Sequence, residues 1–128
     1  MSEAARQGVI LFGHGARDPR WAEPFERLRG KVACLRDGVP VVLAYLEMMT
    51  PDLDTATDAL VAEGCTDVTI VPIFFGQGSH LRRDLPLQVD ALRARLPAVT
   101  VTVAEAAGED DAVLAAVADY CVRSSTVA

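Results

Sequence analysis

Short apolar runs alternate along the chain with longer stretches in which apolar residues recur at steps of three and four. Four runs have the length of a buried strand, at residues 8–13, 39–46, 67–75 and 99–103. A stretch with helical periodicity follows each of them. Strands that alternate with helices are typical of a parallel sheet covered by helices. We therefore predict one α/β domain over residues 1–128, since 128 residues suffice for a single core and leave no room for a second.

Start and stop signals place the helices between these runs. Asp18 before Pro19 and Asp52 after Pro51 are typical helix caps, and Gly64 is a typical helix stop. The third helix is predicted to begin at residues 84–86 and the last at residues 109–111. The predicted buried stripes are Trp21, Phe25, Leu28, Val32 and Leu35; Leu53, Ala56, Leu60 and Val61; Leu85, Val89, Leu92 and Leu96; and Val113, Leu114, Val117, Tyr120 and Cys121.

The third apolar run, residues 67–75, is the most continuous of the four. We expect it to lie inside the sheet with both faces covered. Pro72 within it cannot donate a hydrogen bond, so the strand either has an edge or bulge there or stops pairing on that side near Pro72. In the fourth run Thr100 and Thr102 alternate with valines, which predicts that one face of that strand is less buried.

Two histidines occur in the chain, and each follows a predicted strand. His14 comes after the first apolar run and His80 after the third, while Glu47 follows the second. Both intervals, from 14 to 47 and from 47 to 80, are 33 residues, about one strand-helix repeat. Because ligands of open α/β sheets bind beyond the carboxyl ends of the strands, these three positions predict a site at that edge.

Composition narrows the classes of partner. The net charge of −6 opposes general binding to nucleic acid or to anionic lipid. No apolar run approaches the ~18 residues that span a bilayer, so we expect no membrane segment and no export signal. Three widely spaced cysteines form no metal or disulfide framework and suit a reducing cytoplasm.

The glycine-flanked histidines favour metal chemistry over phosphate chemistry. Neither G-x-G segment is completed as G-x-G-x-x-G, and no G-K-[ST] occurs. His14 has no preceding Arg, which argues against a phosphohistidine enzyme. Imidazole and carboxylate are good ligands for divalent first-row metals, so His14, Glu47 and His80 form a candidate open metal site. The alternatives are turn-stabilising histidines and a solvated glutamate.

Three segments resemble the CbiX-type sirohydrochlorin cobaltochelatases. Residues 9–19 read VILFGHGARDP, similar to the family's opening G-H-G-S-R-D, with Ala16 in place of the serine. Residues 71–75 and 78–86, VPIFF and GSHLRRDLP, resemble its second motif, G-x-H-x-x-x-D-[IL]-P. Residues 45–47 with Pro51 resemble its middle segment. The resemblance covers nearly the whole chain and the short, single-domain form of the family.

The resemblance implies a class II, ATP-independent chelatase whose four-stranded parallel sheet has the order 2-1-3-4. It further implies a homodimer that inserts a divalent metal into sirohydrochlorin in cobalamin or related tetrapyrrole biosynthesis. His14, His80 and Glu47 are then the metal ligands and catalytic residues. No tightly bound cofactor is implied, because the metal is a substrate. Co²⁺ is the favoured ion, and Ni²⁺ and Fe²⁺ fit the same donors.

Sirohydrochlorin carries acetate and propionate groups, so cationic side chains are expected beside the site. Arg17, Arg82 and Arg83 are predicted to lie in suitable loops, and Ser79 is a further candidate for substrate binding. For each arginine the alternative is an exposed or helix-paired side chain. For the protein as a whole, the alternatives are a non-catalytic carrier of tetrapyrrole or metal, and a hydrolase with His14 as base, which lacks a credible nucleophile.

Overall fold

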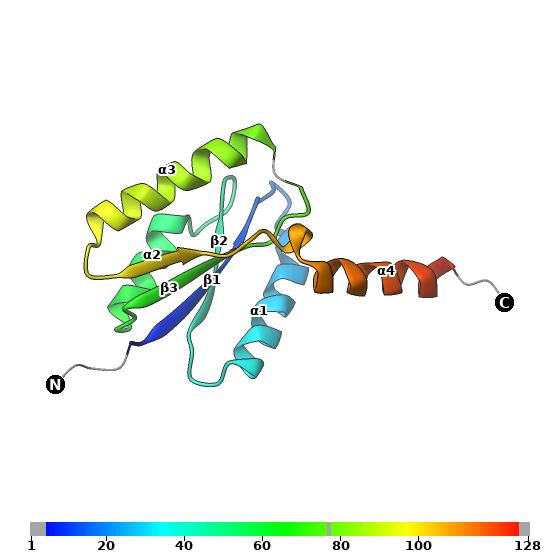
Figure 1. The fold of residues 1–128 in the computed structure, drawn as a ribbon, viewed down its shortest axis with the longest axis horizontal. Helices are drawn as coiled ribbons and strands as arrows, with labels where there is room; N and C mark the ends of the chain where they lie inside the picture. The colour runs from blue at the N-terminus through cyan, green and yellow to red at the C-terminus, as the bar shows by residue number, and fades with distance from the viewer. Residues whose placement is uncertain (1–4, 77, 126–128) are drawn as a thin grey trace.

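The computed structural model describes residues 5–76 and 78–125. Its elements follow the predicted alternation (Figure 1) and are, in order, β1 (Gln7–Gly13), η1 (Pro19–Ala22), α1 (Glu23–Leu35), β2 (Val41–Tyr45), α2 (Leu53–Ala62), β3 (Asp67–Pro72), α3 (Ser79–Arg95), β4 (Thr100–Val103), η2 (Ala107–Glu109) and α4 (Asp111–Ser125). The strands form one parallel sheet in the order β2-β1-β3-β4. The predicted fold class and strand order are both confirmed.

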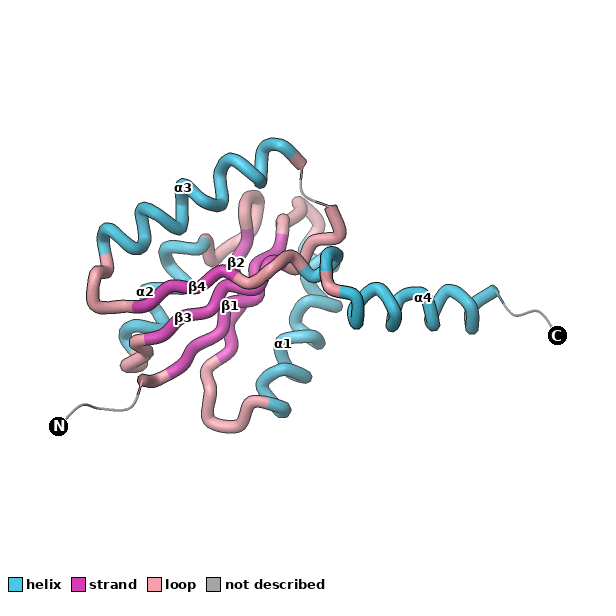
Figure 2. Tube along the Cα trace, in the orientation of Figure 1, coloured by secondary structure: helices cyan, strands magenta, loops and turns pink. Residues whose placement is uncertain are grey.

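The sheet lies between two layers of helices (Figure 2). Side chains alternate along β1, so that Ile10 and Phe12 join the core beneath α2 and α3. Leu11 points to the other face, where Phe25 of α1 covers it. Ile10 and Phe12 are completely buried. β1 is therefore buried on both faces, and the parallel pairing brings the carboxyl ends of all four strands to one edge.

The predicted helix cap is confirmed at Asp52, whereas Asp18 caps a short 3-10 turn and not α1, whose N-cap is Ala22. The Asp52 carboxylate accepts a hydrogen bond from the backbone N–H of Thr55 at 2.8 Å and begins α2. These bonds from Thr55 favour the charged carboxylate and hold the pKa of Asp52 below its usual value. Asp18 caps η1, a short 3-10 turn that precedes α1, by accepting from the N–H of Arg20 at 2.9 Å.

The third strand is shorter than predicted. Residues 67–75 were expected to form it, but β3 ends at Pro72. On the β1 side pairing continues one step, since the N–H of Ile73 donates to the Phe12 carbonyl at 2.9 Å. On the β4 side the last register pair is Ile70 with Val103, so the missing N–H of Pro72 falls where β4 has already ended. β3 lies between β1 and β4, which confirms its predicted inner position. The prediction that both of its faces are covered is wrong for one face, because Thr69 and Val71 are only half-buried.

The predicted start of the third helix at residues 84–86 is wrong. α3 begins at Ser79 and contains Pro86. A proline inside a helix removes one hydrogen bond and leaves the carbonyl four residues earlier without its partner. Pro86 itself lies on the exposed side of the helix. Leu85 and Val89, buried beneath the same helix, hold it on the sheet.

The predicted buried stripe of the first helix is only partly correct, and that of the last helix is wrong. Leu35, at the end of α1, is 83% exposed. In α4 no residue is buried, and the helix runs away from the sheet on the side where the strands end (Figure 1). Its main contact is with η2. No helix among the described residues is long and apolar enough to cross a membrane.

The outer edge of the sheet is covered at one point by an arginine. Arg93 of α3 donates from Nε and Nη2 to the Val101 carbonyl of β4, at 3.1 and 2.7 Å. Val101 itself is buried, whereas Thr100 and Thr102 are exposed. The predicted difference between the two faces of the fourth strand is therefore confirmed.

Candidate metal centre

The loops after β1 and β2 are held together by backbone hydrogen bonds that extend beyond the sheet. The N–H of Leu46 donates to the Gly13 carbonyl at 2.9 Å, and the N–H of Glu47 donates to the His14 carbonyl at 3.0 Å. These two bonds continue the β1–β2 pairing past Gly13 and Tyr45. They place His14 and Glu47 side by side at the carboxyl edge of the sheet.

Glycines are required where these loops approach one another. Gly15 has φ +98°, and a Cβ at this position would lie 1.8 Å from the Glu47 carbonyl oxygen. Only glycine fits both the left-handed backbone and the close approach. On the other side of His14, a Cβ on Gly13 would lie 1.8 Å from the Phe25 ring. The two glycines therefore fix the backbone on both sides of His14.

The side chains of His14 and Glu47 meet at donor-atom distance. His14 Nε2 lies 2.9 Å from Glu47 Oε1. Metal bonds to these atom types are ~2.1 Å, so two ligands at right angles around one ion lie ~3.0 Å apart. The two side chains are 56% and 49% exposed, which lets an ion from solvent reach both. A hydrogen bond between side chains this exposed contributes little stability by itself. The pair is therefore free to exchange its mutual hydrogen bond for a shared cation.

An aromatic side chain links His14 to the loop between β3 and α3. The ring of Phe74 lies 6.4 Å from that of His14 and 5.9 Å from that of Phe12, between centroids. Phe74 was not among the predicted site residues, because residues 73–75 were assigned to the strand. Pro72 was the signal that could have placed Phe74 in the loop, where its ring contacts a candidate ligand.

His80 lies in the first turn of α3, directly after the loop that carries Phe74. Its side chain, and that of Ser79, are outside the described part of the structure, so the predicted roles of His80 and Ser79 stay predictions. Among the described residues no three His, Cys, Asp or Glu side chains form a metal-binding group. His14 and Glu47 are thus two candidate ligands among the described residues.

Three predicted substrate-binding arginines are exposed. Arg17 lies in the loop after β1, as predicted. Arg82 and Arg83 were predicted in a loop but lie on α3, because that helix begins earlier than its Pro86 suggested. Arg20, next to these candidates in the first loop, pairs with Asp18 at 2.8 Å. This hydrogen-bonded pairing raises the pKa of Arg20 and lowers that of Asp18.

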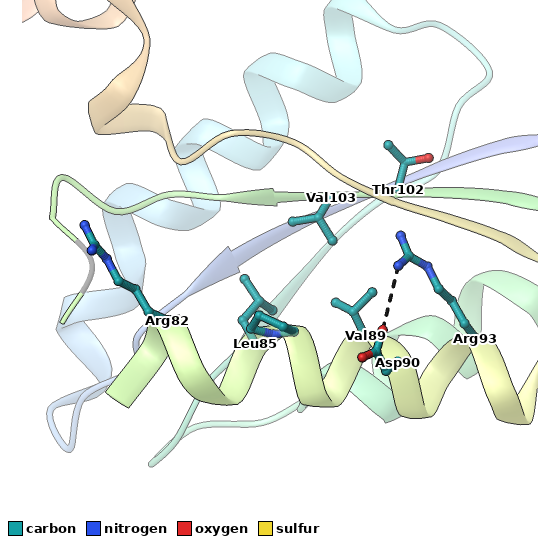
Figure 3. A pocket seen from close by; sticks show the side chains of 8 residues that line it. Arg82, Leu85, Val89, Asp90, Arg93, Thr102 and Val103 are labelled. Carbon is teal, nitrogen blue, oxygen red and sulfur yellow. Dashed lines mark ion pairs between the residues drawn. The ribbon is translucent and has the colours of Figure 1, made fainter. Parts of the chain in front are cut away.

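Two hollows are each lined by a predicted site residue, one by Glu47 and the other by Arg82. One, of about 500 Å³, is lined by Glu47 together with the loop and helix start that follow β2. The other, of about 480 Å³, lies between α3 and β4, and Figure 3 shows Arg82 at one end of it and Arg93 towards the other. Neither His14 nor Glu47 lines the second hollow. The first hollow is therefore the one at the candidate centre, because Glu47 lines it and contacts His14.

The fold and the paired donors define a small α/β protein with a candidate metal centre at the carboxyl edge of a parallel sheet. Comparison with known proteins agrees with this class. A model of the CbiX family matches residues 8–123. A CbiX protein of Marinobacter aquaeolei VT8, whose name places it in cobalamin biosynthesis, superposes with a TM-score of 0.82 at 32% identity, over 92% of this chain and 96% of that one.

Sequence relatives are named as sirohydrochlorin chelatases. The sirohydrochlorin cobaltochelatase of Saccharolobus solfataricus is 30% identical over 113 residues, which are 81% of this chain and 84% of the relative. The sirohydrochlorin ferrochelatase of Bacillus subtilis is 26% identical over 119 residues, 88% of this chain but 43% of the relative. The present chain thus spans less than half of the Bacillus protein. The chain belongs to the CbiX family.

Proposed function

We propose that residues 1–128 act as one domain that inserts a divalent metal ion into sirohydrochlorin without ATP. The observation that carries the proposal is the 2.9 Å contact between His14 Nε2 and Glu47 Oε1 at the carboxyl edge of the sheet. Family membership supports the choice of substrate, since the curated relatives are named for sirohydrochlorin. The sequence offers no phosphate-binding loop that would supply a nucleotide.

The reaction exchanges one divalent ion for two protons. Two pyrrole N–H groups lose their protons, four ring nitrogens bind the ion, and the ion loses its water ligands. In our proposal His14 and Glu47 take the ion from solvent and hold it beside the ring. Imidazole and carboxylate can also accept the departing protons, so the same pair serves as ligand and base. His80 is proposed as the third ligand, from the first turn of α3.

Co²⁺ is the proposed ion. The Saccharolobus relative, which this chain matches over most of its length, is named a cobaltochelatase, whereas the longer Bacillus relative is named a ferrochelatase. The donor atoms of His14 and Glu47 do not discriminate between Co²⁺, Ni²⁺ and Fe²⁺, because all three ions accept nitrogen and oxygen ligands. The metal is a substrate here, and no resident cofactor is proposed.

The carboxylates of the substrate are assigned to Arg17, Arg82, Arg83 and Ser79. Guanidinium groups form paired hydrogen bonds with carboxylates. Arg17 follows His14 by three residues, and the other three residues lie in the first turns of α3 around His80. Exposure of all three arginines supports a role in contacting an external ligand.

We also propose that the protein works in the cytoplasm as a homodimer. Its three cysteines are all free, which fits a reducing compartment. The resemblance to the short, single-domain form of the family supports the homodimer.

The test is metal insertion followed by the absorbance of the tetrapyrrole. Purified protein is mixed with sirohydrochlorin and Co²⁺, Ni²⁺ or Fe²⁺ separately, each against a control without protein. We expect Co²⁺ to give the largest rate above background. We expect His14→Ala, His80→Ala and Glu47→Gln each to lower that rate by roughly 10²-fold or more, the size of a lost acid-base group.

Glu63→Gln is the matched control for Glu47→Gln. Glu63 follows α2, which runs away from the carboxyl edge, and it is exposed. This variant should keep the wild-type rate. Binding of Co²⁺ or sirohydrochlorin without any metal insertion would contradict the proposed enzyme activity and indicate a carrier of metal or tetrapyrrole. An unchanged rate in a correctly folded His14→Ala variant would contradict the proposed centre.

A further inference from the structure

Large apolar side chains are exposed in the loops on either side of His14. Met48 follows β2 and is 59% exposed, and Phe75 follows β3 and is 65% exposed. Single exposed apolar residues are common on protein surfaces. These two differ because β1 lies between β2 and β3, so the loop that carries His14 lies between the loops that carry them. Their exposure therefore concerns the candidate metal centre and not an arbitrary part of the surface.

The loop after β2 holds Met48 in a fixed turn. The N–H of Glu47 donates to the His14 carbonyl at 3.0 Å, and the N–H of Tyr45 donates to the Pro51 carbonyl at 3.0 Å, which closes the loop. Met48 has φ +67°, in the left-handed region that a residue other than glycine rarely adopts. Strained backbone of this kind is found preferentially at functional sites. The turn leaves the thioether side chain in solvent directly after a candidate metal ligand.

The loop after β3 holds the backbone of Phe75 just as closely. The N–H of Gly108 in η2 donates to the Phe74 carbonyl at 2.8 Å. A Cβ on Gly108 would lie 2.4 Å from the Cα of Phe75 and 2.2 Å from its carbonyl oxygen, so only glycine permits this approach. The Phe74 ring contacts that of His14, whereas the Phe75 ring is exposed. The backbone of Phe75 is therefore tightly packed while its ring stays in water.

We propose that Met48 and Phe75 contact the face of the flat tetrapyrrole and hold its centre over His14. Neighbouring strands lie about 4.8 Å apart, so β2 and β3, on either side of β1, are separated by roughly 10 Å. A flat ring that rests on both side chains has its centre above the middle loop, where His14 Nε2 meets Glu47 Oε1. The inference rests on the proposed function, because it takes sirohydrochlorin as the ligand, and it adds the residues that bind the ring itself.

The chemistry of the two side chains suits the face of a conjugated ring. A phenyl ring and a thioether both make favourable contacts with unsaturated rings, and covering either of them removes apolar surface from water. The carboxylates at the rim of the ring are assigned to cationic side chains such as Arg17, in the same loop as His14. The face and the rim are then bound by different residues, and neither set overlaps with the two candidate metal ligands.

The test measures two affinities of each full-length variant by titration calorimetry, one for metal-free sirohydrochlorin and one for Co²⁺ alone. Met48→Gln and Phe75→Ser make each contact polar, whereas Met48→Leu and Phe75→Leu keep it apolar. Leu35→Ala is the matched control, because Leu35 is 83% exposed but ends α1, where the chain returns to the start of β2 at the opposite edge of the sheet. Circular dichroism checks that each variant is folded.

We expect Met48→Gln and Phe75→Ser each to weaken sirohydrochlorin binding by roughly 10-fold, the effect of losing one partly covered apolar side chain. The double variant should lose roughly 100-fold, because the two loops contact separate parts of the ring. The leucine variants should restore most of the affinity. The affinity for Co²⁺ should be unchanged in every variant, and Leu35→Ala should match the wild type for both ligands.

Unchanged affinity for sirohydrochlorin in the double variant would overturn the inference. An equal loss of affinity for Co²⁺ would also overturn it, because Met48 and Phe75 would then act through the metal centre. A loss with Leu35→Ala would mean that the ring binds exposed apolar side chains without regard to place. Metal insertion by the wild type is measured separately. If insertion is absent but the ring affinities behave as expected, the enzyme activity fails and the ring contacts stand, whereas a wild type that does not bind sirohydrochlorin removes both.

Discussion

Gly15→Ala is expected to separate the two candidate ligands, His14 and Glu47, without replacing either of them. The new Cβ would lie 1.8 Å from the Glu47 carbonyl oxygen, whereas ordinary contact begins at 3.4 Å. The loops after β1 and β2 must therefore part by about 1.6 Å. That movement breaks the 3.0 Å hydrogen bond from the N–H of Glu47 to the His14 carbonyl, and it draws the carboxylate away from His14 Nε2.

Two contributions set the size of the effect on stability. An alanine at φ +98° bears the cost of left-handed backbone, roughly 1–2 kcal/mol. The lost backbone hydrogen bond adds about 1 kcal/mol. We expect the free energy of unfolding to fall by about 2–3 kcal/mol. Co²⁺ affinity should fall about 10–100-fold, as when groups that orient metal ligands are removed.

Gly30→Ala is the matched control. Gly30 lies inside α1, and a Cβ there meets nothing within 4 Å. Alanine should stabilise the helix by roughly 0.5–1 kcal/mol and leave Co²⁺ binding unchanged. Urea unfolding and calorimetric titration with Co²⁺ measure both quantities for both variants. If Gly15→Ala keeps wild-type stability and Co²⁺ affinity, the reasoning that the loop approach positions the pair is wrong.

Two further predictions concern the helix cap and the thiols. Asp52→Ala should destabilise the protein by about 1 kcal/mol at pH 7, whereas Asp52→Asn keeps the cap. Folding lowers the pKa of Asp52, so the stability that its carboxylate contributes is fully present above the ordinary pKa of 3.8 and is lost as the pH falls through the folded pKa. Urea unfolding should therefore show a smaller stability difference between the wild type and Asp52→Ala at pH 3 than at pH 7. Burial raises the pKa of the Cys65 thiol, whereas Cys34 is exposed. Ellman's reagent should therefore label Cys34 quickly and Cys65 only on unfolding. Rapid labelling of Cys65 in the native protein would contradict its burial.

The sequence carries most of the information on the fold, because strand burial and helix caps are local signals. Asp18 and Asp52 mark helix starts through short-range hydrogen bonds, and these are where predicted. The start of α3 was missed because a proline usually stands in the first turn of a helix. α3 contains Pro86 in its interior, on the side of the helix that faces water. Which side of a helix faces water is decided by how the helix packs against the sheet, and this packing is not a local signal.

The contact between His14 and Glu47 was foreseen from their spacing, because residues that end neighbouring parallel strands meet at one edge. The role of Gly15 was not foreseen, because Glu47, whose carbonyl oxygen a Cβ on Gly15 would meet, lies 32 residues away in the chain. The outward course of α4 could not be predicted either. An apolar stripe indicates that a helix is covered, but the sequence does not distinguish cover by its own sheet from cover by another molecule.

The contact of Arg93 with the Val101 carbonyl also limits how copies of this protein can assemble. An exposed edge strand invites the backbone of another chain to extend the sheet, which leads to open-ended fibres. A strand approaching β4 would first have to displace two hydrogen bonds from one guanidinium group. Growth by adding strand to strand is thereby disfavoured at this border, and association is directed towards closed assemblies of defined size.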